Sequence, residues 1–231
     1  MPGRNDSFTF QLRNSFSVTV PRSMLGPFRE CFLDEVYLKH INPSLLAKES
    51  PVIIDIGSNV GYFSLFMFYR FPKATIYGFE PLPYCFNTLK QYKDQYPRFN
   101  WHIYQLGVSD KEGSFEIYSD SPDGFSTTAS MFLKDKPYKI VMRTKPLPDV
   151  VQENNISRID FLKLDCEGAE YSILYNLPDD VWQKISCVSM ESHALEGERE
   201  NVFALVDFLK TKNFTITFIE KNRGGHIWAS R

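Results

Sequence analysis

Three acidic residues gather where one predicted strand ends. Residues 159–165 form an apolar run with the strand pattern, and Asp165, Glu167 and Glu170 lie at its carboxyl end. Neighbouring carboxylates raise one another's pKa, so this crowding indicates a candidate catalytic or binding site. In the alternative interpretation, Glu167 and Glu170 only favour the following helix through its dipole. Lys163 shares a strand face with Asp165 and should meet a buried carboxylate, because a buried unpaired ammonium is costly.

A second polar pair ends the next predicted strand, 185–191. Glu191 and His193 share a face at its tip, close to where Asp165 should emerge. Histidine titrates near neutral pH, so His193 is a candidate general base that could take the proton of a substrate hydroxyl group. It could equally be an ordinary histidine at a strand end. Asp165, Glu191 and His193 could also bind a divalent metal ion, an alternative that we do not favour from the sequence.

Residues 52–63, with the sequence VIIDIGSNVGYF, predict a buried parallel strand, a glycine turn and the start of a helix. Such a unit presents backbone N–H groups and a positive helix end to a ligand. A dinucleotide fingerprint would need glycine at 57, 59 and 62, and only Gly57 matches. The pattern Asp-x-Gly-x-Asn-x-Gly instead resembles motif I of class I S-adenosylmethionine (SAM)-dependent methyltransferases. Asn59 replaces the usual middle glycine, a mild change because Asn tolerates a left-handed backbone.

An acid also ends the strand predicted at 74–80. Glu80 occupies the position where nucleotide-binding α/β folds hydrogen-bond ribose hydroxyls, although it could also be a solvated charge. Pro81 follows it, and Asn87 lies on the first turns of the next helix. Beyond a third strand at 99–105, the loop 107–109 occupies the place expected for an adenine ring.

These motifs require a sheet that brings several strand ends together. Strands and helices alternate from residue 50, and the final strands, 214–219 and 226–229, form a hairpin that leaves one strand antiparallel. We therefore predict one α/β domain over residues 1–231, with a Rossmann-like, mostly parallel seven-stranded sheet and helices on both faces.

Two segments depart from this alternation. Residues 1–49 predict a hairpin and a helix interrupted by Pro43, and the hairpin could be either a structural cover or a flap over the site. Residues 111–145 predict an inserted hairpin with a long loop at 119–136. Phe125, Met131 and Phe132 in that loop could line a substrate entrance or belong to a mobile surface loop.

The composition excludes several classes of protein. The 26 basic and 28 acidic residues give a net charge of −2, so nothing favours a nucleic-acid or anionic-membrane partner. Four scattered cysteines without a C-x-x-C pair favour reduced thiols. We find neither an apolar leader segment nor an apolar run long enough to span a bilayer, and we predict a soluble cytoplasmic protein.

Taken together, these motifs resemble the FkbM family of SAM-dependent methyltransferases over roughly residues 50–195. The resemblance is carried by residues 52–64 and 78–81, and above all by 159–170, IDFLKLDCEGAE. Leu164 and Cys166 depart from it, since other small apolar residues usually flank the acid. The resemblance implies SAM as methyl donor and, usually, O-methylation of sugars, polyketides or other secondary metabolites.

On this basis residues 55–61 should hold the methionine end of SAM, Glu80 the ribose and residues 107–109 the adenine, with Asp165 and Glu167 facing the methyl group. The expected catalytic residues are Asp165, Glu167 and His193, with no metal among the favoured ligands. The expected cofactor-binding residues are Asp55, Gly57, Ser58, Asn59, Gly61, Tyr62, Phe63, Glu80, Pro81, Asn87, Gly107, Val108, Ser109 and Asp165.

Several functions stay open at this point. The favoured partner is a small-molecule acceptor with a hydroxyl group, and homodimer formation is possible. N-methylation or a metal-assisted O-methylation would suit the same fold. A nicotinamide-dependent oxidoreductase and a non-catalytic nucleotide-binding domain are the alternatives from other classes.

Overall fold

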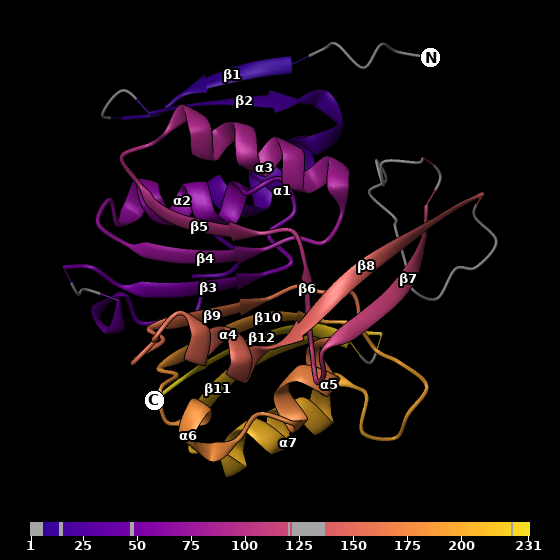
Figure 1. The fold of residues 1–231 in the computed structure, drawn as a ribbon. Coiled ribbons are helices and arrows are strands. Elements are labelled where there is room, and N and C mark those ends of the chain that lie inside the picture. The colour runs from indigo at the N-terminus through magenta and orange to yellow at the C-terminus, as the bar shows by residue number, and fades with distance from the viewer. Residues whose placement is uncertain (1–6, 14–15, 47–48, 120, 122–136, 223) are drawn as a thin grey trace.

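A seven-stranded sheet forms the centre of the computed structural model, which describes residues 7–13, 16–46, 49–119, 121, 137–222 and 224–231 (Figure 1). The strands lie in the order β11-β12-β10-β9-β3-β4-β5, and β12 runs antiparallel to the other six strands. Their bounds are β3 Val52–Ile56, β4 Thr75–Phe79, β5 Asn100–Tyr104, β9 Phe161–Leu164, β10 Cys187–Ser192, β11 Thr215–Lys221 and β12 Gly224–Ser230. This confirms the predicted Rossmann-like α/β arrangement.

Helices cover both faces of this sheet, because neighbouring apolar residues of one strand point to opposite sides. Ile53 packs among residues of α1–α3, whereas Ile54 packs among residues of α4–α7. Figure 1 shows these two groups on opposite sides of the sheet. The helices are α1 Leu25–Phe32, α2 Tyr62–Arg70, α3 Pro83–Gln95, α4 Leu147–Glu153, α5 Glu170–Tyr175, α6 Asp179–Trp182 and α7 Val202–Thr211. Within the described residues, no helix has the length and apolar character to cross a membrane.

The predicted N-terminal hairpin is part of the core. Strands β1 (Ser7–Gln11) and β2 (Ser17–Pro21) pair antiparallel, and Val18 and Val20 of β2 are fully buried. Phe16 stacks on Tyr96 beyond the end of α3, with ring centroids 4.8 Å apart. No described residue of the hairpin lines the large cavity discussed below. These contacts favour the structural cover over the flap.

The segment after the hairpin is less helical than its apolar spacing predicts. Helix α1 ends at Phe32, because the N–H groups of Leu33 and Asp34 both donate to the Arg29 carbonyl, each over 2.9 Å. Glu35 then adopts a left-handed φ of 46°, which stops any continuation. A 3-10 turn, Pro43–Leu45, provides the predicted second piece.

The insertion forms a separate three-stranded sheet in the order β6-β8-β7. Strands β7 (Gly113–Ser119) and β8 (Tyr138–Pro146) pair antiparallel, as predicted. Residues 107–109, predicted as a loop, instead form β6 (Gly107–Ser109), because they pair with the end of β8. The interpretation of Phe125, Met131 and Phe132 lies outside the described residues.

The burial of Phe16 generates a stability prediction with a control in the same hairpin. Phe16→Ala should lower the free energy of unfolding by about 3–5 kcal/mol, because it leaves a cavity among packed rings. Phe8 is 47% exposed, so Phe8→Ala should change it by at most about 0.5 kcal/mol. Urea denaturation measures both values. Two equally small effects would mean that the hairpin is a detachable flap.

Candidate functional site

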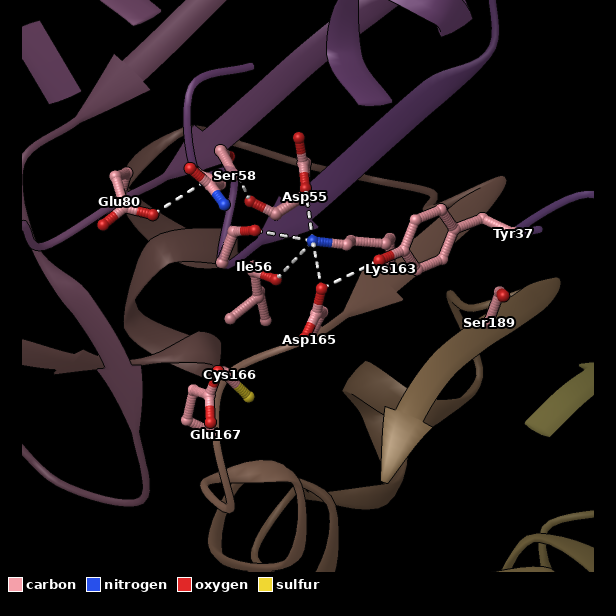
Figure 2. A network of polar contacts seen from close by, with 12 residues as sticks. Tyr37, Asp55, Ile56, Ser58, Glu80, Lys163, Asp165, Cys166, Glu167 and Ser189 are labelled. Carbon is pink, nitrogen blue, oxygen red and sulfur yellow. Dashed lines mark hydrogen bonds and ion pairs between the residues drawn. The ribbon is translucent and has the colours of Figure 1, made fainter. Parts of the chain in front are cut away.

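A buried lysine joins two neighbouring strands at the centre of the sheet. The parallel register of β3 and β9 places Asp55 beside Lys163, and both side chains are almost fully buried. The Lys163 Nζ lies 3.4 Å from Asp55 Oδ1 and 3.8 Å from Asp165 Oδ2, and it donates to the Gly57 carbonyl over 2.6 Å (Figure 2). Burial lowers the pKa of Lys163, but the charges of Asp55 and Asp165 outweigh it and raise this pKa above its usual value. Asp55 is therefore the buried carboxylate that the sequence predicts as the partner of Lys163.

Tyr37 joins this network from the N-terminal segment, where it lies between α1 and the 3-10 turn Pro43–Leu45. Its hydroxyl donates to Asp165 Oδ2 over 2.8 Å, and its ring lies 5.2 Å from Lys163 Nζ. Burial and then the Asp165 charge raise the pKa of Tyr37, so it stays a neutral donor. In the sequence Tyr37 appears only as an apolar helix position, and no local pattern points to this contact.

The glycine turn after β3 has the predicted left-handed backbone. Gly57, Asn59 and Gly61 have φ angles of 75°, 50° and 90°, so Asn59 does replace a glycine in a left-handed position. A Cβ at Gly57 would lie 1.8 Å from the Asp165 carbonyl oxygen, which leaves room only for glycine.

The expectation that this turn offers its N–H groups to a ligand needs correction. The N–H groups of Gly57 and Ser58 donate to the Phe79 carbonyl over 3.0 and 2.9 Å, and that of Asn59 donates to Glu80 Oε2 over 2.7 Å. The Phe79 carbonyl and the Glu80 carboxylate, at the end of β4, therefore already accept these three N–H groups.

Glu80 is buried at the tip of β4. Its two oxygens accept hydrogen bonds from the N–H groups of Asn59 and Leu82, over 2.7 and 2.8 Å. Burial raises the pKa of Glu80 to about 7, although both hydrogen bonds oppose this rise. Each carboxylate oxygen can accept a second hydrogen bond, so Glu80 retains acceptor capacity for a ligand.

A cavity of about 450 Å³ opens at the carboxyl ends of β3, β4 and β9. It brings together nine of the expected residues, namely Gly57, Asn59, Glu80, Pro81, Gly107, Val108, Ser109, Asp165 and Glu167. The cavity is also lined by residues that no sequence motif predicts, including Leu82, Cys85, Phe115, Ile117, Met142 and Tyr171. The β7–β8 hairpin supplies Phe115, Ile117 and Met142, so the insertion is part of the cavity.

Seven expected residues do not line this cavity. Asp55 and Ser58 serve the local structure, since Asp55 pairs with Lys163 and the Ser58 hydroxyl donates to the Asp55 carbonyl over 2.8 Å. Tyr62 and Phe63 are buried among the rings of the α1–α3 face. The remaining three are Gly61, which caps the start of α2, Asn87, which is exposed on α3, and His193, which borders a second cavity.

His193 forms a pair with a buried carboxylate. Its Nδ1 lies 3.3 Å from Glu170 Oε1, and Glu170 also accepts the N–H groups of Cys166 and Gly168, each over 3.0 Å. Burial lowers the pKa of His193, but the hydrogen bond and the charge of Glu170 outweigh it and raise this pKa to about 9. His193 therefore carries a proton at neutral pH, which does not favour it as a general base. Glu170 closes the turn before α5, in line with a structural role.

Comparison with known proteins identifies the class. The family model described as "Methyltransferase FkbM domain" matches residues 55–216. The chain is 30% identical over 220 residues to "Methyltransferase sdnD" of Sordaria araneosa, covering 82% of each chain. It is 29% identical over 217 residues to "31-O-demethyl-FK506 methyltransferase FkbM" of Streptomyces tacrolimicus, covering 82% of this chain and 81% of that one.

Among solved structures, the chain resembles the crystal structure of methyltransferase FkbM from Methylobacillus flagellatus KT. The TM-score is 0.58 at 14% identity, over 84% of this chain and 47% of that longer one. The fold is therefore that of a class I methyltransferase. The chain belongs to the FkbM family of SAM-dependent methyltransferases.

The Lys163 network generates the next prediction. Lys163→Met should lower the free energy of unfolding by about 3–5 kcal/mol, because it leaves the Asp55 carboxylate buried without a counter-charge. Adding Asp55→Asn should recover part of this loss. Lys90 pairs with Asp94 on the surface of α3, so Lys90→Met should cost at most about 0.5 kcal/mol. Chemical denaturation measures the free energy of unfolding of both variants. Equal losses in Lys163→Met and Lys90→Met would contradict a stabilising role of the buried pair.

Proposed function

We propose that this protein transfers the methyl group of SAM to a hydroxyl oxygen of a small-molecule acceptor, either a sugar or another secondary metabolite. One observation carries the proposal. The glycine turn, the Glu80 carboxyl group and the Asp165–Glu167 pair converge on one cavity from three different strand ends. Its volume of about 450 Å³ suits a ligand of nucleoside size.

The lining of the cavity supports one orientation of the cofactor. The Glu80 carboxylate would accept the two ribose hydroxyl protons, as acids at this position of α/β folds do. The adenine would lie against Val108 and the apolar walls contributed by β7 and β8. The methionine part would then pass Gly57 and Asn59, so that the sulfonium comes to lie near Asp165 and Glu167.

The reaction depends mainly on alignment, because the sulfonium of SAM is already activated. The acceptor oxygen forms a bond to the methyl carbon as the bond from that carbon to sulfur breaks, with the two bonds in line. The hydroxyl proton needs an acceptor. Glu167 lines the cavity directly after the Asp165–Cys166 turn and is better placed for this role than His193, which already carries a proton. Asp165, held by Tyr37 and Lys163, would position the acceptor.

The alternatives differ in how much support they have. The name of the Streptomyces relative, a methyltransferase for an O-demethyl compound, supports an oxygen acceptor. N-methylation would need only carboxylates to hold an amine, and it stays the second candidate. Family membership favours methyl transfer over the nicotinamide-dependent and non-catalytic alternatives. Cytoplasmic location and homodimer formation stay predictions.

Cofactor identity can be tested by thermal unfolding. S-adenosylhomocysteine (SAH), the product of methyl transfer, should stabilise the protein by about 2.7 kcal/mol at 100 times its dissociation constant. For a chain of this size, this corresponds to a rise in Tm of about 5–10 °C. NAD at the same concentration serves as the control and should give no rise. A rise with NAD alone would contradict the proposal.

The raised pKa of Glu80 makes cofactor binding depend on pH. Ribose hydroxyls donate to the ionised carboxylate, so the proton that Glu80 holds below pH 7 must leave on binding. SAH affinity measured by calorimetry should therefore fall as pH decreases below about 7, by up to about tenfold per pH unit. Glu80→Gln should weaken binding and remove this dependence. If the wild-type affinity were equal at pH 6 and pH 8, Glu80 would not be the ribose ligand.

A further inference from the structure

We propose that Asp165, Glu191 and His193 form a binding site for one divalent metal ion at the acceptor side of the methyl group. The catalytic part of this proposal, in which the ion binds the acceptor hydroxyl, rests on the proposed function. Ion binding itself does not.

The geometry brings the three side chains together from two adjacent strands. Asp165 directly follows β9, Glu191 lies in β10, and His193 directly follows β10, which pairs with β9 in parallel. One ligand atom from each residue lies within 4.8 Å of the other two. A single ion placed between such atoms can contact all three after small side-chain movements, since metal–ligand distances are about 2.0–2.2 Å.

The surroundings orient two of these side chains for metal binding. Glu170 is fully buried and lies 3.3 Å from Nδ1 of His193. The opposite nitrogen, Nε2, faces away from Glu170, lies 3.9 Å from Glu167 Oε2, and would release its proton when an ion binds. A carboxylate on the second nitrogen is the usual partner of a metal-bound histidine. Tyr37 and Lys163 both contact Oδ2 of Asp165, so Oδ1 is the oxygen that can bind an ion.

The charges of the described residues around this group also favour a cation. Lys163 is balanced by Asp55, and His193 is paired with Glu170. Asp165 and Glu167 lie farther from the same two cations, at 3.8 and 3.9 Å, and Glu191 and Glu30 of α1 add two more carboxylates that interact with Asp165. Lys221 is a nearby cation that acts on Glu191.

The ligand types indicate which ion and which chemistry to expect. Two carboxylate oxygens and one imidazole suit a first-row divalent ion such as Mn²⁺, and water or an acceptor hydroxyl would complete its coordination. A bound divalent ion lowers the pKa of a hydroxyl that coordinates it and fixes its position. The acceptor proton could then pass to Glu167, and the oxygen would attack the methyl carbon.

Titration of the full-length protein with MnCl₂ tests the site without any acceptor. Electron paramagnetic resonance of free Mn²⁺ should show one bound ion per chain with a dissociation constant below about 1 mM. Glu191→Gln and His193→Gln should each weaken binding at least about tenfold, since each removes one ligand. Glu196→Gln is the matched control, because Glu196 is an exposed acid three residues beyond His193. Its affinity should equal that of the wild type.

Two results would overturn the proposal, namely no saturable Mn²⁺ binding or equal losses in Glu196→Gln and Glu191→Gln. SAH binding measured on the same samples separates this question from the proposed function. Retained SAH binding in Glu191→Gln with loss of Mn²⁺ binding supports the metal site. Specific Mn²⁺ binding without any SAH binding would leave the metal site in place and contradict the proposed cofactor.

Discussion

The buried ammonium of Lys163 is the interaction on which the site depends. Removing this charge from water is costly, and the cost is offset only because Asp55, Asp165 and the Gly57 carbonyl surround the ammonium. The same contacts join β3 to β9 and hold the glycine turn against the Asp165 backbone. Through Asp165, the network extends to Tyr37 in the N-terminal segment that follows α1. One set of polar contacts therefore links the N-terminal segment, the sheet and the strand ends.

Around this network, similar carboxyl groups have different roles because their environments differ. Asp55 is fully buried and balances Lys163, whereas Glu170 is fully buried and orients His193. Glu80 is also buried, but it borders the cavity, and its donors among the described residues are two backbone N–H groups, so burial can raise its pKa to about 7. Asp165 and Glu167 face the cavity. The fold thus places acids that are close together in the sequence in different environments, since Glu170 is buried beside His193 whereas Asp165 and Glu167 border the cavity.

Much of this arrangement could be predicted because it is local. The apolar alternation of the strands predicts the sheet, the left-handed tolerance of Asn59 explains the turn, and the cost of burying Lys163 predicts its carboxylate partner. What could not be predicted depends on distant segments. Tyr37 contacts Asp165 although the two residues are 128 positions apart, and the turn N–H groups are occupied because the Phe79 carbonyl and the Glu80 carboxylate lie beside them. The pairing of His193 with Glu170 likewise needs the positions of two strand ends.

The most direct test of the central claim is a crystal structure of the protein with SAH bound. The account predicts adenosine inside the 450 Å³ cavity, ribose hydroxyls on the Glu80 carboxylate, and sulfur at the end of the cavity formed by Asp165 and Glu167. An adenosyl group bound outside this cavity would contradict the account. So would a reversed ligand with its ribose beside Asp165, because the methyl group would then lie far from the residues proposed to meet the acceptor.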